Sequence, residues 1–274
     1  MNRYKDRVAI VTGGASGIGR ALCEELVQKG AIVFVADIDH AGAERVASDI
    51  TAGGQHAQAV EVDVAQQEAV ANLVASAVHQ YGRLDYMFNN AGIALAGEVS
   101  DMETSDWQHA LNINLWGVIH GTNSAYKVML HQGSGHIINT ASGAGLCPAP
   151  MNAAYCTTKY AVVGLSTALR MEAASLGVNV SVVCPGFIRT PIFDSTTYIG
   201  INREQALAQT RSFRMMEPSK CAQVILRAVG RNKAIIPVTA ETHIAWWFYR
   251  IAPAVYDLLG CLLATKYRKL VRGN

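Results

Sequence analysis

Charged residues are scarce in this chain: they make up 16% of its 274 residues, whereas 50% are hydrophobic. A disordered chain needs the opposite balance, so the composition indicates a folded core. The net charge is only +2 and the body of the chain has no basic block, which gives no support to nucleic-acid binding. No repeat or low-complexity linker is visible. We therefore expect one catalytic domain over residues 1–240, with an apolar C-terminal extension over residues 241–274.

Metal-binding and disulfide patterns are also missing. The six cysteines are scattered and form no Cys-x2-Cys pair, so they are typical of reduced thiols in an intracellular protein. His109, His120 and His131 recur on one helical pattern without a carboxylate or second histidine at ligand spacing, and we predict no metal site. The polar N-terminus lacks a signal-sequence pattern, so a cytoplasmic protein is expected.

What is present is an alternation of short apolar runs and amphipathic stretches. The runs predict strands near 8–12, 31–36, 57–62, 84–89, 135–140, 178–184 and 233–237. The stretches between them predict helices near 17–29, 40–52, 66–80, 105–130, 153–176 and 217–230. This alternation is typical of an α/β fold, a Rossmann-type doubly wound parallel sheet of about seven strands with helices on both faces.

A glycine-rich turn follows the first predicted strand and opens the first predicted helix. It contains Gly13, Gly17 and Gly19, spaced Gly-x3-Gly-x-Gly. Glycines in this context let the backbone approach a pyrophosphate, whose charge is stabilised by the helix N-terminus. The spacing differs from the common Gly-x-Gly-x2-Gly, so an ordinary tight turn is the alternative.

Asp37 ends the second predicted strand, about 20 residues past the glycines, where an acid binds the ribose hydroxyls of a dinucleotide. A carboxylate there also repels a 2′-phosphate, by about 4 kcal/mol at 4 Å and an effective dielectric near 20. No Arg or Lys stands at Ser16 or Ile38 to offset that repulsion. NAD(H) is therefore favoured over NADP(H). The alternative role for Asp37 is capping the next helix, for which Asp39 is the better candidate.

Tyr155 and Lys159 stand four residues apart on a predicted helix, on the same face. An ammonium ion beside a phenol favours the phenolate, so we expect a lowered Tyr155 pKa and a Tyr suited to acid–base work. Ser142, on a nearby turn, is placed to hold a substrate oxygen. A lone Tyr-x3-Lys pair is a weak signal, and its alternative is a solvated helix face.

The unusual polar and glycine positions fall where predicted strands end. They are Gly13, Asp37, Asp63, Asn89, Ser142 and Pro185. In an open parallel sheet the carboxyl ends of the strands meet at one edge, and ligands bind there at the topological switch point. The sequence therefore predicts one ligand site at this edge.

Taken together, these motifs resemble the short-chain dehydrogenase/reductases of the classical type, over residues 5 to about 240. The resemblance is carried by residues 12–19, 63–64, 89–92 and 185–191, and by Asn114, Ser142, Tyr155 and Lys159. It implies an oxidoreductase that uses NAD to interconvert an alcohol and its carbonyl. It also implies homodimers or homotetramers formed through the two long helices.

The resemblance assigns roles residue by residue. Tyr155 is implied as acid/base and Ser142 as the group orienting the substrate oxygen. Lys159 is implied to lower the Tyr155 pKa and bind ribose, and Asn114 to hold a proton-relay water, with a polar residue that bends the helix as the alternative. The remaining cofactor contacts are implied at Gly13, Ser16, Gly17, Ile18, Gly19, Asp37, Asp63, Val64, Asn90, Ala91, Gly92, Pro185, Gly186, Ile188 and Thr190. Asn89 is implied to tie the central strands together.

Two segments bear on the substrate. Residues 192–215 are apolar in part, with Gly200 as a hinge, and predict a mobile lid, with ordinary packing as the alternative. The tail 241–274 is rich in aromatic and aliphatic residues and ends in basic ones. It predicts a flap over the pocket, a subunit contact or peripheral membrane contact. Each favours a bulky lipophilic substrate such as a steroid, retinoid or long-chain alcohol or ketone. The rival function is a non-catalytic NAD-binding regulatory or scaffold protein.

Overall fold

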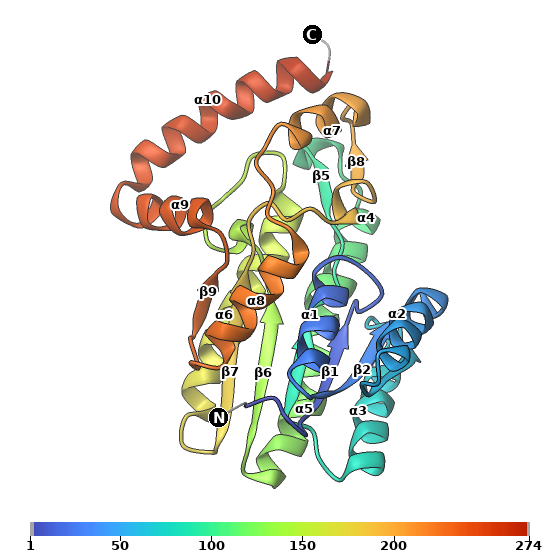
Figure 1. The fold of residues 1–274 in the computed structure, drawn as a ribbon. Coiled ribbons are helices and arrows are strands. Elements are labelled where there is room, and N and C mark those ends of the chain that lie inside the picture. The colour runs from blue at the N-terminus through green and yellow to red at the C-terminus, as the bar shows by residue number, and fades with distance from the viewer. Residues whose placement is uncertain (1–2, 273–274) are drawn as a thin grey trace.

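Seven parallel strands form one sheet in the order β3-β2-β1-β4-β6-β7-β9 in a computed structural model that describes residues 3–272 (Figure 1). The strands are β1 (Val8–Thr12), β2 (Ile32–Asp37), β3 (Ala57–Glu61), β4 (Tyr86–Asn89), β6 (Gly135–Thr140), β7 (Val178–Cys184) and β9 (Ile235–Pro237). Each predicted strand is confirmed to within two residues at each end. β1 pairs with both β2 and β4, so the strand order reverses beside β1.

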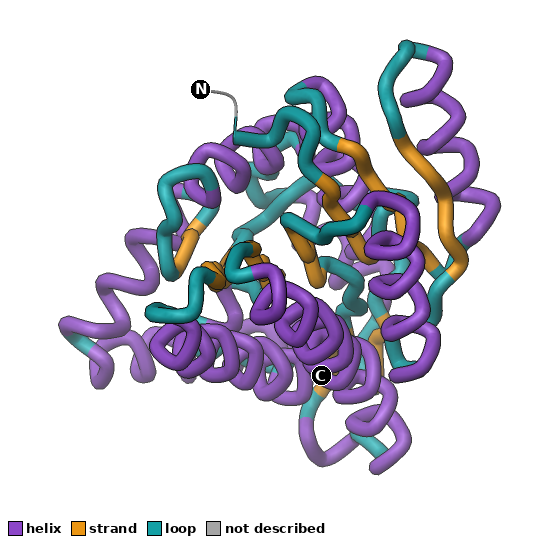
Figure 2. Tube along the Cα trace, turned by 90° about the horizontal axis from the view of Figure 1, so that it is seen from below, coloured by secondary structure: helices purple, strands orange, loops and turns teal. Residues whose placement is uncertain are grey.

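Helices cover both faces of this sheet, as the view from below makes clear (Figure 2). One face carries α1 (Gly17–Gln28), α2 (His40–Ala52) and α8 (Pro218–Val229). The other carries α3 (Gln67–Tyr81), α5 (Gly117–Gln132) and α6 (Ala153–Ala173). The predicted doubly wound α/β fold is confirmed.

Alternation along β1 explains the two layers. Ala9 and Val11 point into the core under α1 and α8, whereas Val8 and Ile10 point into the core under α3 and α5. Because successive side chains of a strand face opposite sides, a strand buried on both faces needs an unbroken apolar run. The glycine-rich turn and the other predicted site segments therefore begin where these buried runs stop.

The helix predicted near 105–130 is not continuous. The structure has α4 (Thr104–Leu111), a π-helical turn at Asn112–Trp116, and then α5. The π turn contains buried Asn114, whereas Asn112 is exposed. Such single π turns arise by local insertion into an α-helix and occur often at functional sites.

The segment after β7 contains more regular structure than the sequence indicated. A short 3-10 turn (Pro191–Phe193) leads to β8 (Thr197–Ile199), which pairs in parallel with β5 (Leu95–Gly97), and α7 (Arg203–Arg211) follows. Two helices then complete the described chain, α9 (Ala240–Ile251) and α10 (Pro253–Arg272). In Figure 1, α10 crosses above the carboxyl ends of the strands and passes over α7.

Candidate active site

The glycine-rich turn adopts backbone conformations that favour glycine. Gly13 has φ 67° and Gly17 has φ 54°, both in the left-handed region. A Cβ on Gly19 would overlap the carbonyl group of Gly13, and a Cβ on Gly13 would lie 2.9 Å from the Cα of Ala91. The turn thus packs directly against the loop that follows β4, and α1 begins at Gly17. The ordinary-turn alternative does not account for this contact between two loops at the switch point.

Asp37 is fastened to the glycine-rich turn. Its Oδ2 accepts a hydrogen bond from the Ala15 N–H at 2.9 Å, and its Oδ1 accepts one from the Asp39 N–H at 3.0 Å. Asp39 caps α2 by accepting a hydrogen bond from the Gly42 N–H at 2.9 Å. The helix cap is therefore Asp39, as the sequence favoured, and the Asp37 carboxylate stays at the end of β2 beside the turn.

Asp63 and Val64 stand after β3, at the same edge. The Asp63 carboxylate accepts a hydrogen bond from the Ala65 N–H at 2.9 Å, which shapes the loop locally. Val64 is buried against Gly117 at the start of α5, and its carbonyl is 3.0 Å from the His120 Nδ1. His120 thus serves as a packing residue of this loop.

The loop after β4 is held by Thr12, a residue of the glycine-rich motif to which the sequence analysis assigned no role. The Thr12 hydroxyl accepts hydrogen bonds from the N–H groups of Asn90 at 3.0 Å and Ala91 at 3.1 Å. The Asn90 side chain donates back to the Thr12 carbonyl at 3.1 Å. Asn89 donates to Asn139 at 2.8 Å and so links β4 to β6, which agrees with its implied structural role. A hydroxyl residue directly before the glycines was the available signal for Thr12.

Tyr155 and Lys159 project from the first turns of α6 toward this loop. The Lys159 Nζ lies 5.5 Å from the centre of the Tyr155 ring and donates a hydrogen bond to the Thr140 carbonyl at 3.2 Å. Ser142, directly after β6, accepts a hydrogen bond from the Ala144 N–H at 3.2 Å. Its side chain also interacts with Tyr155 and lowers the pKa of that phenol. The structure therefore brings the Tyr, Lys and Ser of the predicted set together.

Burial, and not the Lys159 charge, controls the ionisation of this pair. Desolvation raises the Tyr155 pKa above its usual value, and the hydrogen bond to Ser142 opposes that rise. Desolvation also lowers the pKa of Lys159 to about 8, because its side chain is only 3% exposed. The expectation of a lowered Tyr155 pKa is thus wrong for the protein without ligands, because burial outweighs the groups that favour the phenolate.

Asn114 joins the π turn to the loop after Gly92. Its Oδ1 accepts a hydrogen bond from the Ile93 N–H at 2.8 Å, and its Nδ2 donates to the Ile93 carbonyl at 3.0 Å. A Cβ on Gly92 would lie 3.0 Å from the Asn114 Oδ1 and 3.4 Å from the Lys159 Nζ. Asn114 therefore lies beside the same glycine as Lys159, and it also occupies the distorted part of the helix.

The segment after β7 returns to the glycine-rich turn. The Pro185 carbonyl accepts a hydrogen bond from the Gly143 N–H at 2.7 Å, which places it beside Ser142. A Cβ on Gly186 would lie 2.5 Å from the Thr239 Oγ1, and Ile188 is buried in the core. A Cβ on Gly17 would meet the Thr190 side chain at 3.1 Å. The glycine-rich turn and the segment after β7, which are far apart in the sequence, thus contact each other.

Near the predicted lid, the residues differ in how far they are exposed. Phe187 stacks on Phe213 with ring centres 4.5 Å apart and on Phe193 at 6.1 Å. Phe187 and Phe213 stay partly exposed, whereas Leu95 of β5, the strand that pairs with β8, is fully buried. The three phenylalanines of segment 187–213 therefore form one stacked cluster in the segment that follows β7.

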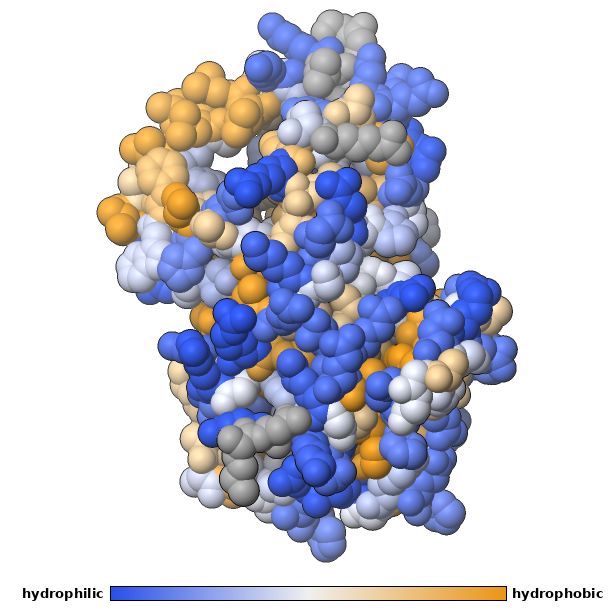
Figure 3. Space-filling model, viewed as in Figure 1, coloured by the Kyte–Doolittle hydropathy of each residue, from blue (hydrophilic) through white to orange (hydrophobic). Residues whose placement is uncertain are grey.

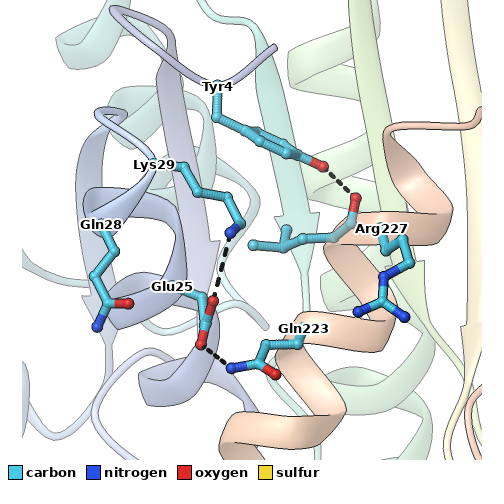
Figure 4. A pocket seen from close by; sticks show the side chains of 7 residues that line it. Tyr4, Glu25, Gln28, Lys29, Gln223 and Arg227 are labelled. Atoms are coloured by element: carbon cyan, nitrogen blue, oxygen red, sulfur yellow. Dashed lines mark hydrogen bonds and ion pairs between the residues drawn. The ribbon is translucent and has the colours of Figure 1, made fainter. Parts of the chain in front are cut away.

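A cavity of about 520 Å³ lies elsewhere, between α1 and α8 (Figure 4). Glu25 in its wall accepts a hydrogen bond from Gln223 at 2.7 Å and pairs with Lys29 at 3.6 Å. Tyr4 donates to the Leu226 carbonyl at 2.6 Å, and burial raises its pKa. These polar groups are engaged with one another and fasten the two helices, so we assign this cavity a structural role.

Comparison with known families decides the assignment of the chain. The model of the short chain dehydrogenase family matches residues 7–198, which include the glycine-rich turn, Ser142, Tyr155 and Lys159. The chain belongs to the short-chain dehydrogenase family. The resemblance inferred from the motifs is thus confirmed.

Individual relatives extend the match over nearly the whole chain. SadH of Mycobacterium tuberculosis, named as an oxidoreductase, is 32% identical over 275 residues, which cover 99% of this chain and 96% of SadH. The CLA biosynthesis dehydrogenase/reductase of Lactiplantibacillus plantarum is 31% identical over 72% of this chain and 70% of its own length. A short-chain dehydrogenase/reductase from Burkholderia phymatum, solved in complex with NAD, superposes with a TM-score of 0.85 at 26% identity, covering 93% of this chain and 96% of that one.

Proposed function

We propose that this short-chain dehydrogenase uses NAD(H) to interconvert an alcohol, secondary or primary, and its carbonyl. The observation that carries the proposal is the convergence of Tyr155, Ser142 and Lys159 beside Gly92, next to the glycine-rich turn. A scaffold protein needs no hydroxyl donor and buried amine at that position. Catalysis of this class needs both, because a proton must be supplied to or taken from the substrate oxygen.

The residues at the edge fit a dinucleotide. Around Gly13 and Gly19 an added Cβ would overlap backbone, so the turn offers main-chain surface for close approach by a pyrophosphate. Asp37 stands where adenosine ribose hydroxyls are bound and disfavours a 2′-phosphate, which supports NAD over NADP. Asp63, Val64, Asn90, Ala91, Pro185, Gly186, Ile188 and Thr190 complete the proposed contacts. NAD in the Burkholderia phymatum structure supports the same choice. When bound, the nicotinamide supplies or accepts the hydride.

Tyr155 acts as the acid/base in this proposal. Its raised pKa keeps the phenol protonated at neutral pH, which suits donation of that proton to a carbonyl oxygen. Ser142 donates to the same oxygen and orients it. Oxidation of an alcohol requires the phenol to lose its proton first, so added positive charge near the ring must offset the effect of burial.

Lys159 and Asn114 act around Tyr155. The Lys159 amine, with a pKa of about 8, is mostly protonated at neutral pH and is placed to bind ribose hydroxyls and favour the phenolate when Tyr155 releases its proton. Asn114 holds the loop beside Gly92 and lies next to Lys159. This position supports its proposed role of holding a water molecule that relays protons to Lys159.

The substrate in this proposal is bulky and lipophilic, a steroid, a retinoid or a long-chain alcohol or ketone. Support comes from the stacked Phe187, Phe193 and Phe213 in the segment after β7. It also comes from the apolar helices α9 and α10, which lie above the carboxyl ends of the strands. We also propose that the enzyme is a homodimer or homotetramer, formed through α5 and α6. These helices expose Trp116, Leu130, Tyr160 and Met171 on or beside them.

A paired assay tests the proposal. NADH and NADPH are each mixed with small and bulky ketones, and NAD with the matching alcohols, while nicotinamide absorbance is followed. We expect turnover with NADH, a marked preference over NADPH, and a higher kcat/KM for bulky lipophilic ketones. Tight NADH binding without turnover on any alcohol or ketone would instead favour a regulatory NAD-binding protein.

A further inference from the structure

Helices α9 and α10 are held on the body of the enzyme by one side only. Ala245, Trp246 and Tyr249 of α9 pack on the core cluster around Leu146 and Val162. At the start of α10 the Tyr256 hydroxyl donates a hydrogen bond to the Pro148 carbonyl at 3.2 Å. Near the other end, the Arg268 guanidinium pairs with Glu98 at 2.5 Å. α10 is thus fastened at both ends, so its outer side keeps a defined orientation.

The outer side of these two helices is apolar. On α9 the exposed residues include Trp247, which is 51% exposed, and Ile251, which is 75% exposed. The full set is Ile244, Trp247, Phe248, Ile251, Val255, Leu258, Leu259, Leu262 and Leu263, which we call the outer apolar face. Figure 3 shows apolar surface over α10 and at the turn that joins it to α9. Contiguous apolar surface of this kind marks an interaction site.

Basic residues continue the outer apolar face at its C-terminal end. Lys266 and Lys269 stand four and seven residues after Leu262, so they lie on the same side of α10. Asp257, the acidic residue of α10, lies on the other side, because it is spaced two residues from Val255 and Leu259. The face therefore combines aliphatic and aromatic side chains with positive charge and carries no carboxylate within residues 244–269 on that side.

This combination fits a lipid surface better than the other occupants. None of the helices within residues 3–272 combines the length and the apolar content that a bilayer crossing requires. Two copies paired through the face would leave Lys266 and Lys269 without an acidic partner on it. Helices with Trp, Phe and Leu on one face and Lys nearby lie in the plane of an anionic membrane interface.

We propose that the outer apolar face docks on an anionic lipid bilayer, with Lys266 and Lys269 contacting the lipid phosphates. Trp247, Ile251, Leu259 and Leu262 then enter the boundary between headgroups and acyl chains. Since α10 crosses above the carboxyl ends of the strands, docking places the edge that holds Tyr155 next to the bilayer (Figure 1). A lipophilic substrate could then reach the site directly from the membrane. This consequence rests on the proposed function, whereas docking itself does not.

Flotation with vesicles tests docking on the full chain. We expect binding to phosphatidylcholine vesicles that contain phosphatidylglycerol and little binding to phosphatidylcholine alone. The double variant Lys266→Gln/Lys269→Gln should bind about 30-fold more weakly, because each lysine near an anionic surface contributes about fivefold. The control Lys127→Gln/Lys233→Gln removes the same charge from the opposite end of the sheet and should bind like the wild type.

Apolar insertion is tested on the same vesicles. Leu259→Ser/Leu262→Ser should lose binding, whereas Leu176→Ser, at an exposed leucine elsewhere, should keep it. A blue shift of tryptophan emission on vesicle addition should vanish in Trp247→Phe. Unchanged vesicle binding by both α10 variants, or no vesicle binding by the wild type, overturns the proposal. So does a wild type that stays off vesicles while Leu259→Ser/Leu262→Ser lowers its oligomeric state, since the face is then a subunit contact.

Turnover separates docking from the proposed function. With a small water-soluble ketone, all of these variants should keep wild-type kcat/KM, because their substitutions lie outside the machinery around Tyr155. With a lipophilic ketone dissolved in anionic vesicles, the α10 variants should lose activity in proportion to lost binding. Vesicle binding without turnover on any ketone would refute the proposed function and leave docking standing.

Discussion

The glycine-rich turn and the C-terminal helices border the same edge of the sheet, but they are packed in opposite ways. At Gly13 and Gly19 an added methyl group would overlap neighbouring backbone. At Gly260 in α10 it would meet no atom within 4 Å. The tight packing of the turn suits the close approach of main chain to a ligand of fixed shape. The helices leave apolar side chains uncovered, which suits a varied or fluid partner. Under the proposed function, reaction chemistry resides in the glycine-rich turn and the residues packed around it, which we call the tight half. Substrate choice then resides in the C-terminal helices, which we call the loose half.

Removing the Tyr155 hydroxyl should produce the largest effect. We expect Tyr155→Phe to lose about a hundredfold to ten-thousandfold in turnover, because it removes the acid/base. NADH binding, followed by fluorescence, should persist, since the turn is untouched. Tyr160→Phe, on the same helix but partly exposed, is the control and should keep its activity. Near-normal turnover by Tyr155→Phe would falsify the proposed chemistry.

Gly19→Ala compared with Gly260→Ala tests the packing difference directly. Gly19→Ala should destabilise the fold by about 1–3 kcal/mol through overpacking, and it should weaken NADH binding. Gly260→Ala should stabilise α10 by up to about 1 kcal/mol, because alanine favours a helix and has room here. Urea unfolding and NADH titration measure both. Equal losses of unfolding free energy in the two variants would show that the turn and α10 do not differ in packing.

Lys159 gives the tight half a characteristic pH dependence. Its folded pKa of about 8 lies below the ordinary lysine value of 10.5, so the unfolded chain binds more protons above pH 8 and stability rises with pH. Relative to Lys159→Met, the free energy of unfolding of the ligand-free wild type should rise by about 1 kcal/mol from pH 8 to pH 9. Tyr155 stays protonated over this window, because burial raises its pKa.

Referencing the wild type to Lys159→Met cancels the ionisation of the cysteines that do not interact with Lys159, which are all but Cys184. Urea unfolding at matched ionic strength gives the difference. A flat difference across the window would mean that Lys159 is solvated in solution, contrary to its burial in the structure.

The smallest effect is expected at the fastening of α10. Arg268→Gln removes a surface pair with Glu98 and should change the free energy of unfolding by no more than about 1 kcal/mol. Its effect should appear instead as a higher KM for bulky ketones, because α10 crosses the substrate side. Arg20→Gln breaks a comparable surface pair with Glu24 in the other half and should leave that KM unchanged.

The sequence predicted the tight half well because its signals are local. Buried runs such as residues 8–12 specify strands, and the glycines and Asp37 follow them directly. The three-residue strands β5 and β8 were missed, since their pairing joins Leu95 to Thr197 across a distance that no local pattern records. The ionisation of Tyr155 was mispredicted because spacing shows a neighbouring charge but not the burial of both groups. The apolar tail was recognised, but which of its sides faces outward depends on the packing of Trp246 and Tyr249.

The small parallel sheet of β5 and β8 has a kinetic consequence. β5 follows the loop that contains Gly92 and Ile93, and the Thr197 N–H donates to the Ala94 carbonyl at 3.1 Å. Any outward movement of segment 192–215 must therefore break this ladder and pull on the chain that lies beside Lys159 and Asn114. Departure of the product and loosening of the coenzyme site become linked events. We therefore predict that the parting of these two three-residue strands limits turnover, so that solvent viscosity and temperature should affect the rate more than isotopic substitution of the hydride.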